Sequence, residues 1–207
     1  MNLDLFYPEP CENILPYDGH VEDFGLICTA AEAEKSLAYL LENLNWQHDE
    51  AKIHGRHYVT ARKYAWYADY QAHYIYSGFK HKAEEVWDPF LVRVKNKIEA
   101  LTKTTFNSCL ANLYLDGTQS MGWHSDADDF LGKQPVIASL SFGATRKFRF
   151  KHMLTKECLE MNLYSGQLIV MKGDTQIFWQ HTIPKMTKII EPRVNLTFRN
   201  IYSETLC

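Results

Sequence analysis

The clearest strand signal in the chain is Arg193-Val194-Asn195-Leu196-Thr197-Phe198-Arg199. Side chains two residues apart on a strand share a face, so Val194, Leu196 and Phe198 line one face and the polar residues line the other. An apolar face of this kind is expected to pack on a core. The stretch therefore predicts a strand within a sheet, with a polar face that carries two arginines.

These two arginines need an anionic partner. Arg193 and Arg199 would repel each other inside a fold, and burying either guanidinium without a partner is costly. A dicarboxylate resolves this conflict, because each guanidinium can pair with carboxylate oxygens through charge-assisted hydrogen bonds. The plainer alternative is a basic edge strand that faces solvent.

Short strand-like runs begin shortly after Phe106 and continue toward the end of the chain. Several short strands at this spacing are typical of a sandwich or jelly roll, and not of alternating strands and helices. The predicted fold class is therefore mostly β. The runs cover residues 109–115, 136–142, 147–151, 159–163, 168–172, 177–183 and 193–201.

The first half of the chain carries two helix signals. Thr29 followed by Glu32 is a capping-box pattern, and leucines at helical spacing follow it, which predicts a helix at about residues 30–44. Asp88 followed by Pro89 is an N-cap with proline at the first helical position, and it predicts the start of a second helix. Both helices are expected to flank the β core.

The rest of the first half has weaker patterns. Residues 1–28 carry three prolines and no clear period, so we expect an irregular arm laid over the core. Residues 46–79 are rich in Tyr, Trp and His, which predicts paired strands with a turn near His54-Gly55. No linker divides the chain, and we expect one domain. Its parts would be the arm at 1–28, helices and a lid at 29–105, and a jelly-roll core at 106–202.

The composition is that of a globular protein without a global attraction to polyanions. The 207 residues are 46% hydrophobic and 23% charged, with a net charge of −3. Nucleic acid would therefore have to bind through local basic patches, although each patch alone is more simply a solvated face. The candidates are Arg56-His57, Arg62-Lys63, Lys80-His81-Lys82 and the segment from Arg146 to His152.

The cysteines and the apolar runs bear on the compartment. Five scattered cysteines without CxxC spacing argue for a reducing compartment and against a disulfide framework or a zinc cluster. The N-terminus lacks the pattern of a signal peptide, and no apolar run reaches the roughly 18 residues of a membrane span. We expect no secretion signal, and a cytoplasmic location if the source is bacterial or a nuclear one if it is eukaryotic.

A second chemical signal is Gly122-Trp123-His124-Ser125-Asp126. On an extended segment His124 and Asp126 point to one side and can reach a single metal ion, whereas Ser125 would face away. His181, in a later strand-like run, can complete a facial triad of two histidines and one carboxylate. That set suits non-haem iron(II) and leaves positions open for substrate and oxygen. Zinc is a weaker option, because it prefers a closed tetrahedral site or a bound water.

Together these segments resemble the AlkB family of iron(II)- and 2-oxoglutarate-dependent dioxygenases, in the branch of the human DNA-repair homologues two and three. The resemblance covers about residues 45–202 and implies a double-stranded β-helix (jelly-roll) core with N-terminal helices and a nucleotide-recognition lid. The segments that carry it are Asn112-x-Tyr114, His124-x-Asp126, residues 138–144, His181 and residues 192–199.

Carried over residue by residue, the resemblance implies a site for iron(II) and 2-oxoglutarate, with O2 as co-substrate. The catalytic metal ligands would be His124, Asp126 and His181. The residues that bind 2-oxoglutarate would be Arg193, Tyr114 and Asn195 at the distal carboxylate, and Arg199 and Asn112 near the end that chelates the metal. Thr197 would line the same pocket.

The resemblance also implies a lid over the substrate base. Tyr74 and Tyr76 share one face of a strand and could hold a flipped base, with a cation–π gain for a positively charged alkylated ring. Two core tyrosines are the plainer interpretation of an isolated Tyr-x-Tyr. Asp128, near the mouth of the site, could accept a hydrogen bond from an exocyclic amino group. Some relatives carry an acid directly after the iron-binding Asp, whereas this chain has Ala127 there.

The segment Ile53-His54-Gly55 aligns with a hairpin that related duplex-repair enzymes push into the base stack. An apolar wedge at a tight turn can fill the gap that a flipped base leaves. Ile53 and His54 are less bulky than a Val-Phe wedge, so activity on duplex is a hypothesis.

The function implied is oxidative demethylation of N-alkylated bases of the 1-methyladenine and 3-methylcytosine type, by direct reversal with release of formaldehyde and succinate. The partner would be alkylated DNA, with RNA as a further candidate, and we expect a monomer without membrane contact. Two alternatives stay open. One is a 2-oxoglutarate-dependent hydroxylase of a protein or small molecule, and the other is a non-catalytic reader of alkylated nucleic acid.

Overall fold

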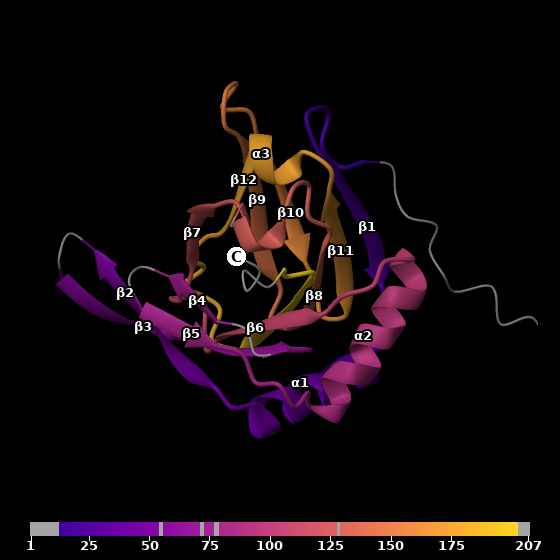
Figure 1. Cartoon of the computed structure of the whole chain (residues 1–207), viewed down its shortest axis with the longest axis vertical. Coiled ribbons are helices and arrows are strands. Elements are labelled where there is room, and N and C mark those ends of the chain that lie inside the picture. Colours follow the sequence, from indigo (N-terminus) through magenta and orange to yellow (C-terminus); the bar gives the residue numbers. More distant parts are fainter. Residues whose placement is uncertain (1–12, 54–55, 71–72, 77–78, 128, 203–207) are drawn as a thin grey trace, which may run out of the picture.

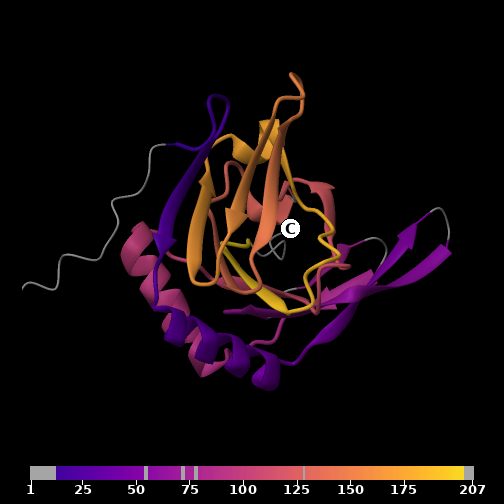
Figure 2. The ribbon, with the colours of Figure 1, turned by 180° about the vertical axis from the view of Figure 1, so that it is seen from behind.

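A computed structural model describes residues 13–53, 56–70, 73–76, 79–127 and 129–202 of the chain. Two antiparallel sheets face each other, and two long helices cover the outer side of the larger sheet (Figure 1). Seen from behind, the same layers recur, with the helices on one side and the smaller sheet on the other (Figure 2). No helix of the described residues is long and apolar enough to cross a membrane.

The larger sheet has seven strands, and every neighbouring pair is antiparallel. In spatial order they are β1 (His20–Leu26), β11 (Gln167–Lys172), β8 (Ile137–Gly143), β13 (Arg193–Arg199), β6 (Ser108–Tyr114), β3 (Arg56–Ala68) and β2 (Gln47–Ile53).

The smaller sheet has four antiparallel strands, and a separate two-stranded pair is drawn next to β3, whose hairpin with β2 extends outward (Figure 1). The four are β10 (Cys158–Leu163), β9 (Arg146–His152), β12 (Trp179–Ile183) and β7 (Met121–His124), and the separate pair is β4 (His73–Tyr76) with β5 (Phe79–Lys82). Two facing sheets of this kind confirm the predicted jelly-roll class.

The helices form where the sequence signals predict them. α1 (Ala30–Asn43) starts with a complete capping box between Thr29 and Glu32. α2 (Pro89–Thr102) starts with Asp88, whose side chain accepts hydrogen bonds from the first turn. Lys103 ends α2 in the left-handed conformation, with φ of 55°. A 3-10 helix (Asp129–Leu131) and α3 (Thr175–Phe178) are short elements of the loops.

Apolar clusters of the described residues hold these layers together, and two of them are large. One lies between the helices and the larger sheet and includes Leu40, Leu91, Val194, Leu196 and Phe198. The other lies between the two sheets. Because the apolar face of β13 belongs to the helix-side core, its polar face points between the sheets. This orientation follows the alternation predicted for residues 193–199 and positions the candidate site.

Two sequence expectations were wrong. Residues 20–26 form β1, an edge strand paired with β11, and not an irregular arm. A register shift between Asp23 and Leu26, with Gly25 at φ of 66°, breaks the alternation that would have revealed the strand. In the run predicted as a strand at 177–183, Ile177 and Phe178 belong to α3, because their backbone amides bond to the carbonyl of Asp174.

Candidate active site

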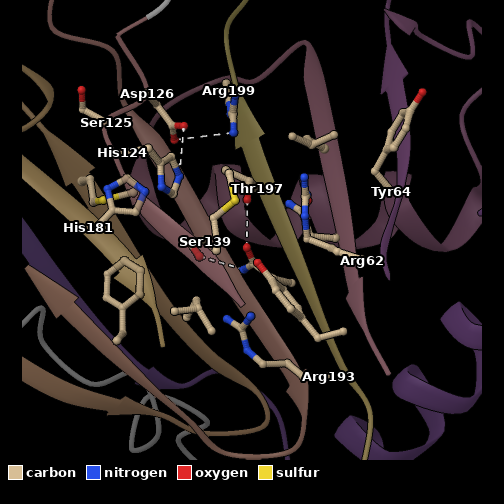
Figure 3. A pocket seen from close by; sticks show the side chains of 18 residues that line it. Arg62, Tyr64, His124, Ser125, Asp126, Ser139, His181, Arg193, Thr197 and Arg199 are labelled. Atoms are coloured by element: carbon tan, nitrogen blue, oxygen red, sulfur yellow. Dashed lines mark hydrogen bonds and ion pairs between the residues drawn. The ribbon is translucent and has the colours of Figure 1, made fainter. Parts of the chain in front are cut away.

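A cavity of about 160 Å³ opens between the two sheets, where the polar face of β13 meets β7 and β12 (Figure 3). Its walls carry both ionisable and apolar side chains. The residues that line it are Arg62, Tyr64, Leu110, Asn112, Tyr114, Met121, His124, Ser125, Asp126, Ser139, Phe148, Met171, His181, Ile183, Arg193, Asn195, Thr197 and Arg199.

The three predicted metal ligands meet at one end of this cavity. His124 on β7 and His181 on β12 are opposite each other in the ladder between those strands, and their ring centroids are 4.2 Å apart. Asp126 follows β7, with a carboxylate oxygen 4.0 Å from Nε2 of His124. One ligand atom from each residue lies within 4.8 Å of the others, so the three can hold one ion.

Neighbouring groups orient these ligands. Nδ1 of His124 lies 2.9 Å from the carbonyl of Gly122, which leaves Nε2 for a metal. The backbone amide of Asp126 donates to Oε1 of Gln176 at 2.8 Å. Nη2 of Arg199 lies 3.5 Å from Oδ2 of Asp126.

The electrostatics also favour a bound cation. Burial would raise the pKa of Asp126, but the nearby cation of Arg199 lowers it, and the resulting pKa lies below its ordinary value. Burial, helped by His124, lowers the pKa of His181 to about 3, so its imidazole is neutral at physiological pH. Nδ1 of His181 is buried without a hydrogen-bond partner among the described residues. A neutral imidazole at His181 and an ionised carboxylate at Asp126 are the states that metal binding requires.

The other end of the cavity is cationic. Arg193 is 2% exposed, and its Nη2 donates to the hydroxyl of Ser141 at 2.9 Å. Its Nε and Nη1 have no hydrogen-bond partner among the described residues. Burial lowers the pKa of Arg193 to about 10, which still leaves it charged at neutral pH. A buried guanidinium with two unmet donor groups fits a carboxylate ligand.

Comparison with known proteins agrees with this geometry. A family model described as the 2OG-Fe(II) oxygenase superfamily matches residues 22–199. The chain belongs to this superfamily. Iron(II) and 2-oxoglutarate are thus its cofactors, and the donor set at each end of the cavity fits the corresponding group.

Two relatives place the chain in the AlkB family. It is 39% identical over 182 residues to human alpha-ketoglutarate-dependent dioxygenase alkB homolog 3, an alignment that covers 84% of this chain and 63% of that one. It is 33% identical over 190 residues to mouse DNA oxidative demethylase ALKBH2, which covers 86% and 79% of the two chains. The chain thus spans about 63% of the length of the human relative.

A solved structure of OsALKBH1 superposes with a TM-score of 0.59 at 14% identity. The superposition covers 90% of this chain and 98% of the other. At this identity the likeness shows the shared fold.

The structure brings most predicted residues of this AlkB-family site into one cavity. Asn112 and Tyr114 on β6 lie opposite Asn195 and Arg193 in the register with β13. The Asn195 amide donates to the hydroxyl of Ser139 at 2.8 Å, and the Thr197 hydroxyl donates to Oδ1 of Asn195 at 3.0 Å. Ser125, expected to face away, lies at the cavity edge with its hydroxyl pointing away from the imidazoles (Figure 3).

The predicted substrate contacts are not placed in the same way. His54, Gly55 and Asp128 lie outside the described residues. Tyr74 and Tyr76 belong to β4, and Ile53 ends β2.

Arg62 and Tyr64 are cavity residues that sequence reasoning missed. The sequence places Arg62 in a candidate basic surface patch, yet its Nη1 donates to Oδ1 of Asn112. Both residues reach the cavity because β3 pairs with β6, with Tyr64 opposite Asn112. Tyr64 and Asn112 are 48 residues apart in the sequence, so their pairing leaves no local signal in it.

The segment from Arg146 to His152 also differs from the expected basic patch. It forms β9, whose side chains alternate between buried and half-buried. Arg146 and His152 are each 1% exposed, so they contribute nothing to a surface. The outer face carries Lys147 and Arg149, both paired with Glu160, and Lys151. The basic surface of this segment is thus limited to alternate residues.

Proposed function

We propose that this chain removes N-alkyl groups oxidatively from nucleic-acid bases of the 1-methyladenine and 3-methylcytosine type. DNA is the proposed main substrate and RNA a further one. The observation that carries the proposal is a single cavity with a two-histidine, one-carboxylate set at one end and a buried guanidinium with unmet donors at the other. A relative named DNA oxidative demethylase supports the substrate class.

At the metal end, His124, Asp126 and His181 would hold iron(II) as a facial triad. Bound iron and 2-oxoglutarate supply insertion of one oxygen atom from O2 into an N-methyl C–H bond, with succinate and carbon dioxide as co-products and formaldehyde released from the hydroxymethyl group. Arg199 would keep the Asp126 carboxylate ionised and oriented through their 3.5 Å contact. Gln176 would hold the backbone of Asp126 in place.

At the other end, Arg193 would pair with the distal carboxylate of 2-oxoglutarate through Nε and Nη1, the donors that have no partner among the described residues. Tyr114, whose ring lies 5.5 Å from the Arg193 guanidinium, and Asn195 would complete that end. Asn112 and Thr197 would line the pocket toward the metal. Such pairing fixes the orientation of the bound 2-oxo acid relative to the metal ligands.

The β4–β5 pair would be the lid over the substrate base. Tyr76 would stack on the flipped base, and Tyr74 would contact the base or its backbone, since a cationic alkylated ring gains from an aromatic face. Asp128 would accept a hydrogen bond from the exocyclic amino group. The segment Ile53-His54-Gly55 would act as a wedge in duplex substrates.

A surface next to the metal ligands would contact the strand that carries the lesion. Trp123, between Gly122 and His124, is 38% exposed, and Nζ of Lys151 lies 4.3 Å from its ring centroid. An exposed aromatic with a cation is the combination that proteins use for single-stranded nucleic acid. This local surface would provide attraction that the net charge of −3 does not.

We further propose that residues 1–207 form one catalytic domain that acts as a monomer. Supporting the single domain, the strands of the larger sheet come from all parts of the described chain, from β1 near the start to β13 near the end, and the strands of the smaller sheet lie between them in the sequence. The compartment stays a prediction, the cytoplasm for a bacterial source and the nucleus for a eukaryotic one.

The test uses purified protein with iron(II), ascorbate, 2-oxoglutarate and a single-stranded oligonucleotide that carries one 1-methyladenine. Mass spectrometry of the oligonucleotide should show the loss of one methylene group, and the loss should require 2-oxoglutarate. Omitting 2-oxoglutarate and replacing the lesion with adenine are the matched controls.

Other outcomes would redirect the assignment. Succinate formed without repair would favour a hydroxylase of a protein or small molecule. Iron bound with neither product formed, but with tight binding to the alkylated oligonucleotide, would favour a non-catalytic reader.

A further inference from the structure

Arg146 is a buried cation that the proposed chemistry does not use. It is the first residue of β9, it is 1% exposed, and it is one of the largest fully buried side chains. Among the described residues no carboxylate lies within ion-pair distance of it; the carboxylate of Asp116 bonds to Thr118 and acts on Arg146 only from a longer distance. Burial lowers the pKa of Arg146. Because an unpaired buried guanidinium is costly, its position calls for a reason.

The guanidinium of Arg146 joins two loops. Its Nη1 donates to the carbonyl of Asp116 at 3.2 Å, and its Nη2 donates to the carbonyls of Gln119 at 2.7 Å and Pro184 at 2.9 Å. The first two carbonyls precede β7, which ends at His124, and the third follows β12, which carries His181. One planar fork therefore braces the loops next to both metal-ligand strands.

The two loops also approach each other closely without Arg146. The amide of Gly117 donates to the carbonyl of Ile189 at 2.8 Å, and the amide of Met186 donates to the carbonyl of Gly117 at 2.7 Å. A Cβ atom at Gly117 would lie 1.8 Å from the carbonyl oxygen of Met186, so only glycine fits there. The loops are thus held at their tips by backbone bonds and at their base by Arg146.

Arg146 also contacts the wall of the proposed dicarboxylate site. Its guanidinium carbon lies 5.6 Å from the ring centroid of Tyr114, and that of Arg193 lies 5.5 Å from the same ring. Both distances are within the cation–π range. Tyr114 lines the cavity, whereas Arg146 does not. Two guanidiniums therefore contact the ring of one cavity residue, and one of them lies outside the cavity lining.

We propose that Arg146 is a positioning residue for the distal carboxylate of 2-oxoglutarate. It holds the Tyr114 ring against Arg193 and braces the two loops, so that the carboxylate end keeps its shape when the ligand binds. Lysine carries the same charge but cannot offer a planar fork to three carbonyls and an aromatic ring. The inference rests on the dicarboxylate pocket of the proposed function.

The test is Arg146→Lys, with manganese(II) loaded in place of iron so that binding is measured without turnover. Calorimetry compares 2-oxoglutarate with 2-oxobutanoate, a 2-oxo acid that lacks the distal carboxylate. We expect the affinity for 2-oxoglutarate to fall by about tenfold or more, as for other supporting residues of metal sites. The affinity for 2-oxobutanoate should stay nearly unchanged. The ratio of the affinity for 2-oxoglutarate to that for 2-oxobutanoate should therefore fall.

Arg149→Met is the matched control, because Arg149 lies on the outer face of the same strand and pairs with Glu160. It should leave both affinities unchanged. An equal loss for both acids in Arg146→Lys, or no loss, would overturn the inference. Failure of Arg146→Lys to fold, judged by its melting curve, would overturn it too, because Arg146 would then serve the fold as a whole.

The failure of the proposed function would look different. Wild-type protein that prefers 2-oxoglutarate over 2-oxobutanoate but repairs no alkylated oligonucleotide would contradict the demethylase assignment. The role of Arg146 at the carboxylate site would stand in that case.

Discussion

The two faces of β13 differ in their contacts within the protein. The apolar face is fully packed, whereas the polar face keeps hydrogen-bond donors without a partner among the described residues. Val194, Leu196 and Phe198 are each 0% exposed and lie within the helix-side core. On the opposite face, Arg193 retains two donor groups, and Arg199 retains its Nε, without a partner among the described residues. One strand thus carries a stability face, made of Val194, Leu196 and Phe198, and a chemical face, made of Arg193, Asn195, Thr197 and Arg199. Unmet hydrogen bonding in an otherwise well-packed interior marks the face that is built for a ligand.

The largest effect is expected at Asp126, the proposed metal ligand that lies next to Arg199 at the end of the chemical face. Asp126→Ala should abolish iron binding and succinate formation, because two histidines alone do not make the facial triad. The helix-side core is untouched, so the protein should stay folded. Metal analysis and a succinate assay check this prediction, with Asp126→Asn as the isosteric comparison. Retained iron with normal turnover in Asp126→Ala would remove the carboxylate from the site.

A second change separates function from stability on the same strand. Arg193→Met should lower kcat/KM for 2-oxoglutarate by about 100-fold. This is the scale expected when one partner of a buried charge pair is lost. The melting temperature of the ligand-free protein should rise, because a methionine removes the cost of burying an incompletely bonded cation. A variant that lost stability and kept its kcat/KM would reverse the assignment of the two faces.

The increase in stability expected for Arg193→Met should depend on pH. Burial lowers the pKa of Arg193 from its ordinary value to about 10, so above about pH 10 the unfolded chain binds more protons than the folded one. The destabilisation by this group is therefore fully present below about pH 10 and relieved as the pH rises above it. The stability gain of Arg193→Met, measured by denaturant unfolding, should be constant near neutral pH and shrink above pH 10. A gain that grew with pH would contradict the buried charge as its cause.

The stability face should give the opposite result. Phe198 is 0% exposed and packs near Phe106, with ring centroids 6.3 Å apart. Phe198→Ala should lower the free energy of unfolding by about 3–5 kcal/mol, through lost burial and a cavity. Below its melting temperature the variant should keep the wild-type KM for 2-oxoglutarate. Denaturant unfolding and initial rates measure the two quantities, and a large KM change without destabilisation would show that the faces are not separate.

The smallest effect is expected on β9, where the same alternation sets an outer face against an inner one. Lys151→Ala should weaken the binding of a single-stranded oligonucleotide several-fold and reduce the slope of log affinity against log salt by about one. Affinity for 2-oxoglutarate should not change, because Lys151 does not line the cavity. Fluorescence anisotropy at several salt concentrations measures the slope. An unchanged slope would remove Lys151 from the nucleic-acid surface.

Local periodicity explains what could be predicted from the sequence. Alternation in residues 193–199 predicted both faces of β13, and the His124-x-Asp126 spacing predicted two ligands on one side. The capping box at Thr29 predicted the start of α1. Each of these signals lies within a few residues, where strand or helix geometry alone decides which side chains share a face.

Most of what could not be predicted from the sequence depends on which strands pair with each other over long sequence distances. Arg62 reaches Asn112 only because β3 pairs with β6, and nothing near Arg62 in the sequence announces that pairing. Arg146 is different, because its alternation with Phe148 and Phe150 already placed it on an inward face. The charge of the segment suggested a surface, whereas the apolar partners were the better guide.

The measurement that tests the account most directly is the stoichiometry of product formation on an oligonucleotide with one 1-methyladenine. Succinate and formaldehyde should appear in a ratio of about one to one, together with the unmodified oligonucleotide, because one 2-oxoglutarate is consumed for each alkyl group removed. Asp126→Ala should form neither product. Succinate without formaldehyde, or formaldehyde independent of 2-oxoglutarate, would contradict a cavity that joins the metal site and the dicarboxylate site in one dealkylation reaction.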